Sequence, residues 1–203
     1  MSRVRTRPTR DDTREKLFEA AARVFEEQGI GGASIEAVAA AAGFTRGAFY
    51  SNFKSKDELI IAMLEDHVEQ SILRICDLLE KHKNLADFLD ALKTMDRSQQ
   101  DPLGRSPLLH MEMILFVARA EKRRPELAKR LRARRKLVTD IIETTARNSG
   151  GTTIRNPTWA GALVLALEDG FRLHRLIDPE TTPSDSFLRA ISDLERVIGV
   201  ASK

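Results

Sequence analysis

The chain has 203 residues, of which 42% are hydrophobic and 31% are charged, and its formal net charge is +3. This length suits one medium domain or a small domain fused to a larger one, and the composition is ordinary for a globular protein with a packed core. No uncharged apolar stretch approaches the roughly 18 to 20 residues that span a membrane, which argues against a transmembrane protein.

The excess of basic residues is confined to the N-terminal part. Residues 1–56 contain ten Lys or Arg and seven Asp or Glu, whereas residues 57–203 contain 23 of each. A basic arm precedes the first acidic residue. Two interpretations stay open: the arm contacts DNA, at phosphates or in the minor groove, or it is a solvated tail. No apolar run follows it, so no secretory signal is expected. The arm consists of Arg3, Arg5, Arg7 and Arg10.

The first predicted helix carries a hydrophobic pattern over residues 17–28. Its hydrophobic residues recur at the spacing i, i+3, i+4, i+7, and Gly29 follows as a natural helix end. Asp12 and Glu15 have the spacing of a capping box, which predicts that the helix starts near them.

Two shorter helices are predicted next. Ser34 is expected to cap the first of them, which ends near Ala42, and the second covers about residues 46–52. Gly43 separates the two helices and tolerates the positive φ that a helix-turn-helix requires at its turn.

Three phenylalanines are suited to anchor the second of these short helices. Phe44, Phe49 and Phe53 supply apolar side chains for one face, while small residues at Ala39 and Ala42 allow two helices to cross closely. The opposite face then presents hydrogen-bonding side chains to solvent, as a DNA-reading helix must.

A long helix is predicted after residue 55, where Ser55 and Glu58 form a second capping-box pattern. At about 25 residues it would be about 37 Å long, enough to join a small domain to a larger one. Further helices are predicted over residues 88–95, 108–120, 125–148 and 157–176, and Asp101-Pro102-Leu103-Gly104 is expected to separate the first two. A last helix is predicted from Thr182-Pro183 to about residue 198, with four side chains facing inward: Phe187, Ile191, Leu194 and Ile198.

The segment from Thr13 to Leu59 resembles the DNA-binding domain of the TetR (tetracycline-repressor-type) family. The resemblance implies an all-α protein, with an N-terminal three-helix helix-turn-helix domain (1–56) joined by a long helix to a helical ligand-binding and dimerisation domain (57–203). The match is carried by Ala20-Ala21, Phe25, Gly29, Ser34, Ala39, Ala42-Gly43, Tyr50, Phe53, Lys56 and Leu59.

The same resemblance assigns roles in binding double-stranded operator DNA. Arg46 is expected to donate to guanine O6 and N7, and Tyr50 to a phosphate. Ser34 and Lys56 lie at helix N-termini, which favour phosphates. Glu36 is expected to complement a helix dipole rather than contact DNA. The full set of expected DNA contacts is Ser34, Thr45, Arg46, Gly47, Tyr50, Ser51, Asn52 and Lys56.

Residues 108–131 look like the ligand-binding domain of a broad TetR subgroup, which implies a small-molecule effector and a homodimer. The effector is expected to be largely apolar, since Met-rich linings bind such molecules adaptably. Every pocket candidate is also suited to an ordinary core position. The candidates for the pocket are Phe88, Leu92, Met95, His110, Met111, Ile114, Phe116, Trp159 and His174, and those for the dimer interface are Trp159, Ala162, Leu163, Ala166 and Gly170.

Other classes of function remain as alternatives. The four histidines show no metal-ligand spacing, and no phosphate loop or nucleophile elbow is present, so no enzyme, metal or cofactor is expected. A regulator without a small-molecule ligand, or a chromosome-architectural protein, is not excluded by the sequence. The basic stretch 119–136 suits a solvated helix face or a second nucleic-acid surface. The lone Cys76 excludes an internal disulfide and favours a reducing cytoplasm.

Overall fold

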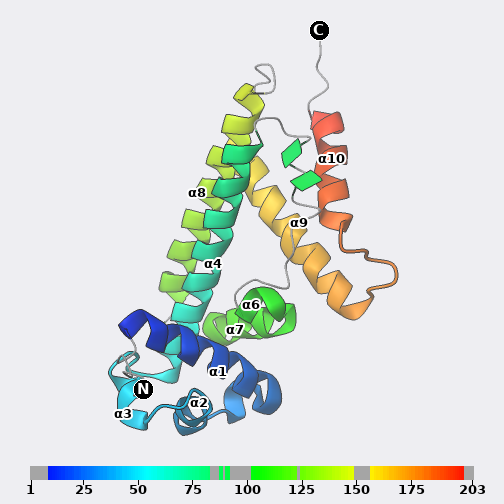
Figure 1. Cartoon of the computed structure of the whole chain (residues 1–203). Helices are drawn as coiled ribbons and strands as arrows, with labels where there is room; N and C mark the ends of the chain where they lie inside the picture. Colours follow the sequence, from blue (N-terminus) through cyan, green and yellow to red (C-terminus); the bar gives the residue numbers. More distant parts are fainter. Residues whose placement is uncertain are drawn as a thin grey trace, which may run out of the picture. The chain divides into compact units, whose positions relative to one another are not determined.

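The computed structural model describes residues 9–82, 87–88, 90–91, 102–122, 124–148 and 156–198, excepting the side chains of 127, 145, 146, 148 and 194–198. All regular structure in these ranges is helical, which confirms the all-α prediction (Figure 1). Arg3, Arg5, Arg7, Leu92 and Met95 lie outside them. The helices are α1 (Arg10–Gly32), α2 (Ile35–Ala41), α3 (Arg46–Tyr50), α4 (Lys56–Lys81), α6 (Pro102–Arg105), α7 (Pro107–Arg119), α8 (Arg124–Asn148), α9 (Pro157–Ile177) and α10 (Ser186–Ile198).

The chain divides into two compact units. The head unit comprises Met1–His67 and Ser98–Arg124, and the body unit comprises Val68–Arg97 and Pro125–Lys203. The long helix α4 contributes residues to both units, and α6 and α7 belong to the head unit. These units differ from the division after residue 56 that the sequence suggested, so the separation of DNA binding and ligand binding at that boundary stays a prediction.

Helix α1 starts earlier than the sequence pattern indicated. Thr9 Oγ1 accepts a hydrogen bond from the Asp12 amide at 3.1 Å, and the Asp12 carboxylate accepts one from the Thr9 amide at 2.9 Å. Asp12 is therefore the third helical residue of a capping box that begins at Thr9, and the predicted pairing of Asp12 with Glu15 is wrong. The predicted end at Gly29 coincides with a kink, where φ is +70°, before a last turn.

Four phenylalanines contribute to the hydrophobic core of the head unit. Phe18, Phe25, Phe49 and Phe53 are buried, and the Phe18 and Phe49 rings both lie 5.8 Å from the Phe53 ring. Because these residues come from α1, α3 and the segment after α3, this cluster fixes α3 to the rest of the head unit.

Two later helices pack against α1 within the head unit (Figure 1). Residues 102–104, which were predicted to break the chain between two helices, belong to the short separate helix α6. Arg105 of α6 forms an ion pair with Glu19 of α1 at 2.5 Å. On α7, His110 is buried with its ring 4.4 Å from that of His67 on α4.

The body unit has a small hydrophobic core in which α10 takes part. Leu188 and Phe88 are buried, and partly buried side chains pack around them: Ile75, Leu78, Leu79, Phe187 and Ile191. The predicted start of the last helix at Thr182-Pro183 is early, because α10 begins at Ser186. Phe187 and Ile191 do pack in this core, whereas the side chains of Leu194 and Ile198 lie outside the described residues.

Helices α8 and α9 approach closely at Gly161. A methyl group at this position would lie 2.5 Å from Thr139 Oγ1 and 3.2 Å from both the carbonyl oxygen of Arg135 and the amide of Thr139. A rotation of the threonine side chain would relieve only the first contact, since the other two are with backbone atoms. Gly161 is therefore required by the packing of these helices within one chain.

We expect Gly161→Ala to destabilise the protein. Overpacking of a tight contact costs about 1–3 kcal/mol, and each kcal/mol lowers Tm by about 2–4 °C in a chain of this size. Gly170→Ala on the same helix is the matched control, because nothing lies within 4 Å of its added methyl group. Calorimetry should show a lower Tm for the first variant only, and equal losses would contradict the close approach.

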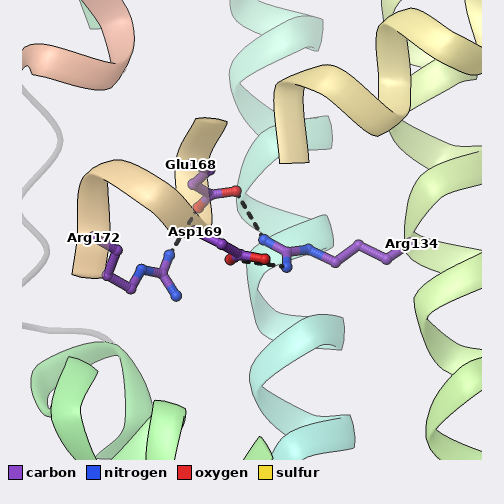
Figure 2. Close-up of polar contacts among 4 residues, drawn as sticks. All are labelled: Arg134, Glu168, Asp169 and Arg172. Atoms are coloured by element: carbon purple, nitrogen blue, oxygen red, sulfur yellow. Dashed lines mark hydrogen bonds and ion pairs between the residues drawn. The ribbon is translucent and has the colours of Figure 1, made fainter. Parts of the chain in front are cut away.

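A partly buried ion cluster also joins α8 to α9 (Figure 2). Arg134 of α8 donates to one carboxylate oxygen of Glu168 at 2.8 Å, and Arg172 donates to the other at 2.8 Å. Asp169 lies farther from Arg134, at 4.0 Å. Burial raises the pKa of Asp169 above its ordinary value, and the charge of Arg134 offsets this only in part.

The raised pKa predicts a pH-dependent effect of Asp169→Asn. A carboxyl whose folded pKa exceeds its unfolded pKa contributes stability below the unfolded pKa, and loses it as the pH rises through the folded pKa. Asp169→Asn should therefore have a higher Tm than wild type at pH 7, and the difference in Tm should disappear near pH 4. Since the Asp169 side chain is 41% exposed, solvent screening keeps the gain below about 1 kcal/mol.

Thermal unfolding at both pH values tests this expectation. Asp140→Asn is the control, because Asp140 is an exposed partner of Lys136 on α8 and its replacement should change little. A lower Tm of Asp169→Asn at pH 7 would show that the attraction to Arg134 outweighs the cost of burying the charge.

Candidate nucleic-acid interface

Local hydrogen bonds fix the geometry of the helix-turn-helix. Ser34 Oγ accepts from the Ala37 amide at 3.0 Å at the start of α2, and Thr45 Oγ1 accepts from the Ala48 amide at 3.2 Å at the start of α3. Between them, Gly43 has φ of +74°, as the turn was predicted to require. The predicted cap at Ser34 and the turn at Gly43 are thus confirmed.

The two faces of α3 differ sharply. Phe49 is completely buried, whereas the neighbouring Tyr50 is 42% exposed. Arg46 and Gly47 are exposed as well, so the first turn of α3 presents its polar side to solvent. The helix therefore has the anchored inner face and the open outer face that entry into a DNA groove requires.

Three side chains form a polar cluster on this outer face. Arg46 Nη1 pairs with the Glu36 carboxylate at 3.1 Å, and Nη2 makes a long 3.5 Å hydrogen bond to Tyr50 Oη. The guanidinium also lies 5.4 Å from the centre of the Tyr50 ring. The hydrogen bond to Tyr50 and then the charge of Glu36 raise the pKa of Arg46 above its ordinary value. The expectation that Glu36 only complements a helix dipole is therefore incomplete.

Ser51 and Asn52 turn back toward α3. Ser51 Oγ donates to the Ala48 carbonyl oxygen at 2.8 Å, and Asn52 Nδ2 donates to the same oxygen at 2.9 Å. Asn52 Oδ1 is buried without a hydrogen-bond partner among the described residues. These contacts hold the end of α3, and the predicted assistance of both residues in phosphate binding stays a prediction.

Lys56 is directed toward the end of α1. Its ammonium donates to the carbonyl oxygens of Ile30 at 2.7 Å and Ala33 at 2.9 Å, and lies 3.5 Å from that of Gly31. A cation at this position neutralises the exposed carbonyls of a helix C-terminus. The side chain thus ties α4 to α1, and only the backbone amide of Lys56 remains suited to the predicted phosphate contact.

The predicted pocket residues fall into both units. On α7 of the head unit, His110 is buried, while Met111, Ile114 and Phe116 are partly buried. In the body unit Phe88 is buried, whereas Trp159 and His174 of α9 are exposed in the single chain, and the pocket lining stays a prediction.

The predicted dimer residues lie along α9. Trp159 is 59% exposed, Ala166 is exposed, and Ala162, Leu163 and Gly170 are partly buried. Further along the same helix, other large apolar side chains are exposed: Leu173, Leu176 and Ile177. This helix therefore carries accessible apolar area in a single chain.

The described residues contain neither a metal-binding cluster nor a helix suited to span a membrane. Within the part of the chain that the structure describes, no group of three or more His, Cys, Asp or Glu side chains is placed to hold a metal ion. None of the helices described there combines the length and the apolar character needed to cross a membrane.

The helix-turn-helix is similar to that of known regulators. Residues 17–63 match the family model for bacterial regulatory proteins, tetR family. Over 100 residues the chain is 33% identical to the HTH-type transcriptional regulator TtgR of Pseudomonas putida, covering 49% of this chain and 40% of that relative. Over 61 residues it is 38% identical to the HTH-type transcriptional regulator AcrR of Shigella flexneri, covering 30% and 28%. The matches therefore span less than half the length of these curated relatives.

Solved structures resemble the chain over more of its length. The reduced form of E. coli NemR aligns with a TM-score of 0.69 and 24% identity, covering 90% of this chain and 97% of that one. The multidrug binding protein EbrR, complexed with imidazole, aligns with a TM-score of 0.59 and 24% identity, covering 97% and 99%. At these identities the likeness shows the fold.

Proposed function

We propose that the chain is a ligand-responsive transcriptional regulator of the TetR family that reads operator DNA with α3, since its helix-turn-helix matches the model of that family. The proposal includes a homodimer, a pseudo-palindromic operator, a small and largely apolar effector that releases the DNA, and action in the bacterial cytoplasm. Repression is the proposed outcome of DNA binding.

The observation that carries this proposal is the outer face of α3. Arg46 and Tyr50 are exposed on it, while Phe49 and Phe53 anchor the other side in the core. Arg46 can present its guanidinium to guanine O6 and N7, and the hydroxyl of Tyr50 can donate to a phosphate. The exposed Gly47 between them allows the backbone to approach the DNA closely.

The exposed apolar side chains of α9 support the homodimer. Trp159, Leu173 and Ile177 are 59%, 42% and 76% exposed, and Ala162, Leu163, Ala166 and Gly170 lie on the same helix. An apolar surface of this kind is removed from water when two copies associate. Two heads also read two half-sites, which explains how a small helix-turn-helix reaches useful affinity.

Helix α4 and the solved relative structures support a response to an effector. Because α4 contributes to both the head unit and the body unit, a change in the body unit can reach the segment beside α3 through one helix. EbrR is named as a multidrug binding protein. For nearly complete release, the effector must prefer the non-DNA form by about 10⁴-fold, or about 5.5 kcal/mol.

Selection of duplexes from a random pool by the purified full-length chain tests the proposal. We expect a pseudo-palindromic sequence to be enriched, and native mass spectrometry should find two protein copies on the enriched duplex. Failure to enrich any sequence would contradict operator recognition, and one copy per duplex would contradict the homodimer. Release of the duplex by apolar compounds in a ligand screen would then support the effector.

A further inference from the structure

The polar cluster on the outer face of α3 has an unusual member for a DNA-binding surface. Glu36 of α2 places a carboxylate 3.1 Å from Nη1 of Arg46, and the two side chains are 55% and 63% exposed. Both side chains remain accessible to DNA. The carboxylate of Glu36 therefore lies close to any part of the DNA that Arg46 contacts. A carboxylate this close lowers the net charge that the guanidinium presents to a phosphate.

The effect of this carboxylate depends on what Arg46 meets. A phosphate is attracted mainly by charge, and the Glu36 carboxylate cancels much of the charge of the guanidinium. The edge of guanine is neutral and offers two hydrogen-bond acceptors, so its recognition depends mainly on the placement of the N–H donors. The carboxylate therefore weakens phosphate binding more than guanine binding.

Placement of the donors is restricted by the same cluster. Glu36 holds one side of the guanidinium, the Tyr50 hydroxyl lies 3.5 Å from Nη2, and the centre of the Tyr50 ring lies 5.4 Å from the guanidinium carbon. Three contacts from α2 and α3 restrict a side chain that would otherwise sample many rotamers. A restricted arginine loses less conformational freedom when it binds one base edge.

From this geometry we propose that Glu36 is a specificity-determining residue, which lowers the affinity of Arg46 for non-specific DNA while preserving its contact with guanine. This inference rests on the proposed DNA-binding function. It assigns Glu36 no contact with DNA of its own, and its action passes through Arg46.

The test compares Glu36→Gln with wild type on two duplexes, the one enriched by the wild-type chain and a shuffled version of it. We expect the dissociation constant for the shuffled duplex to fall on the order of fivefold for each head. The slope of log K against log salt should steepen by about 0.9 for each phosphate gained by a head. The enriched duplex should change by less than about twofold, because the glutamine amide oxygen can still accept a hydrogen bond from Arg46 and the guanine contact is kept.

Two controls separate this effect from a general loss of negative charge. Glu27→Gln removes an exposed glutamate of α1 and should leave the ratio of the two affinities unchanged. In an Arg46→Gln background, Glu36→Gln should no longer alter that ratio. Equal changes in both duplexes, or the same effect with and without Arg46, would overturn the proposal.

The outcome also separates this inference from the proposed function. If the wild-type chain enriches no duplex, both fail. If it enriches one and Glu36→Gln keeps the wild-type ratio and salt slope, DNA recognition stands and the role of Glu36 is refuted.

Discussion

Arg46→Ala should weaken binding to the enriched duplex by at least about 30-fold. A bidentate contact between arginine and guanine contributes about 1–3 kcal/mol, and a dimer loses two such contacts, which gives about 2–6 kcal/mol. The shuffled duplex should lose much less, because Glu36 already offsets the charge of Arg46 at 3.1 Å. Fluorescence anisotropy on both duplexes measures the two losses.

Tyr50→Phe is the natural companion of this variant. It removes the hydroxyl expected to donate to a phosphate, and should weaken binding to both duplexes similarly. It also removes the long hydrogen bond from Arg46, so a small loss of base preference is expected. If Arg46→Ala weakened both duplexes equally, Arg46 would be a phosphate contact and its assignment to guanine would be wrong.

Phe49→Ala should destabilise the head unit by about 3–5 kcal/mol, the cost of emptying a buried aromatic position. Phe49 is completely buried, and its ring lies 5.8 Å from that of Phe53. Loss of this contact releases α3 from the core, so DNA binding should fall together with stability. Denaturant unfolding followed by circular dichroism measures the change.

Phe44→Ala provides a comparison within the same motif. Phe44 is only partly buried at the turn before α3, so its truncation should cost less than that of Phe49. Arg46→Ala should leave the unfolding midpoint close to that of wild type, because its side chain is exposed. A stable Phe49→Ala variant with normal DNA binding would contradict the anchoring of α3 by the aromatic core.

Features set by neighbouring residues could be predicted from the sequence. The cap at Ser34 depends on an amide three residues away, and the positive φ of Gly43 depends on the turn itself. Asn156-Pro157 likewise marks the start of α9, where the Asn156 side chain accepts from the Trp159 amide at 3.0 Å. Each of these signals depends only on nearby residues, so it can be recognised from the sequence alone.

Contacts between distant segments could not be predicted in this way. Lys56 and Ile30 are 26 residues apart, and Arg105 and Glu19 are 86 apart, so no spacing rule connects them. The pairing of Glu36 with Arg46 depends on how α2 and α3 cross, which periodicity does not specify. The start of α1 was predicted at the wrong residue, because both Thr9 and Asp12 have side chains that can cap a helix.

Methylation of guanine N7 by dimethyl sulfate tests most directly whether α3 enters the major groove. On the enriched duplex, the wild-type chain should protect one guanine in each half-site, because the Arg46 guanidinium would occupy N7 and O6. Arg46→Ala, assayed at a concentration that restores full occupancy, should leave those guanines reactive. Identical protection by both proteins would show that Arg46 does not contact these guanines, and absence of protected guanines in the major groove would contradict its reading by α3.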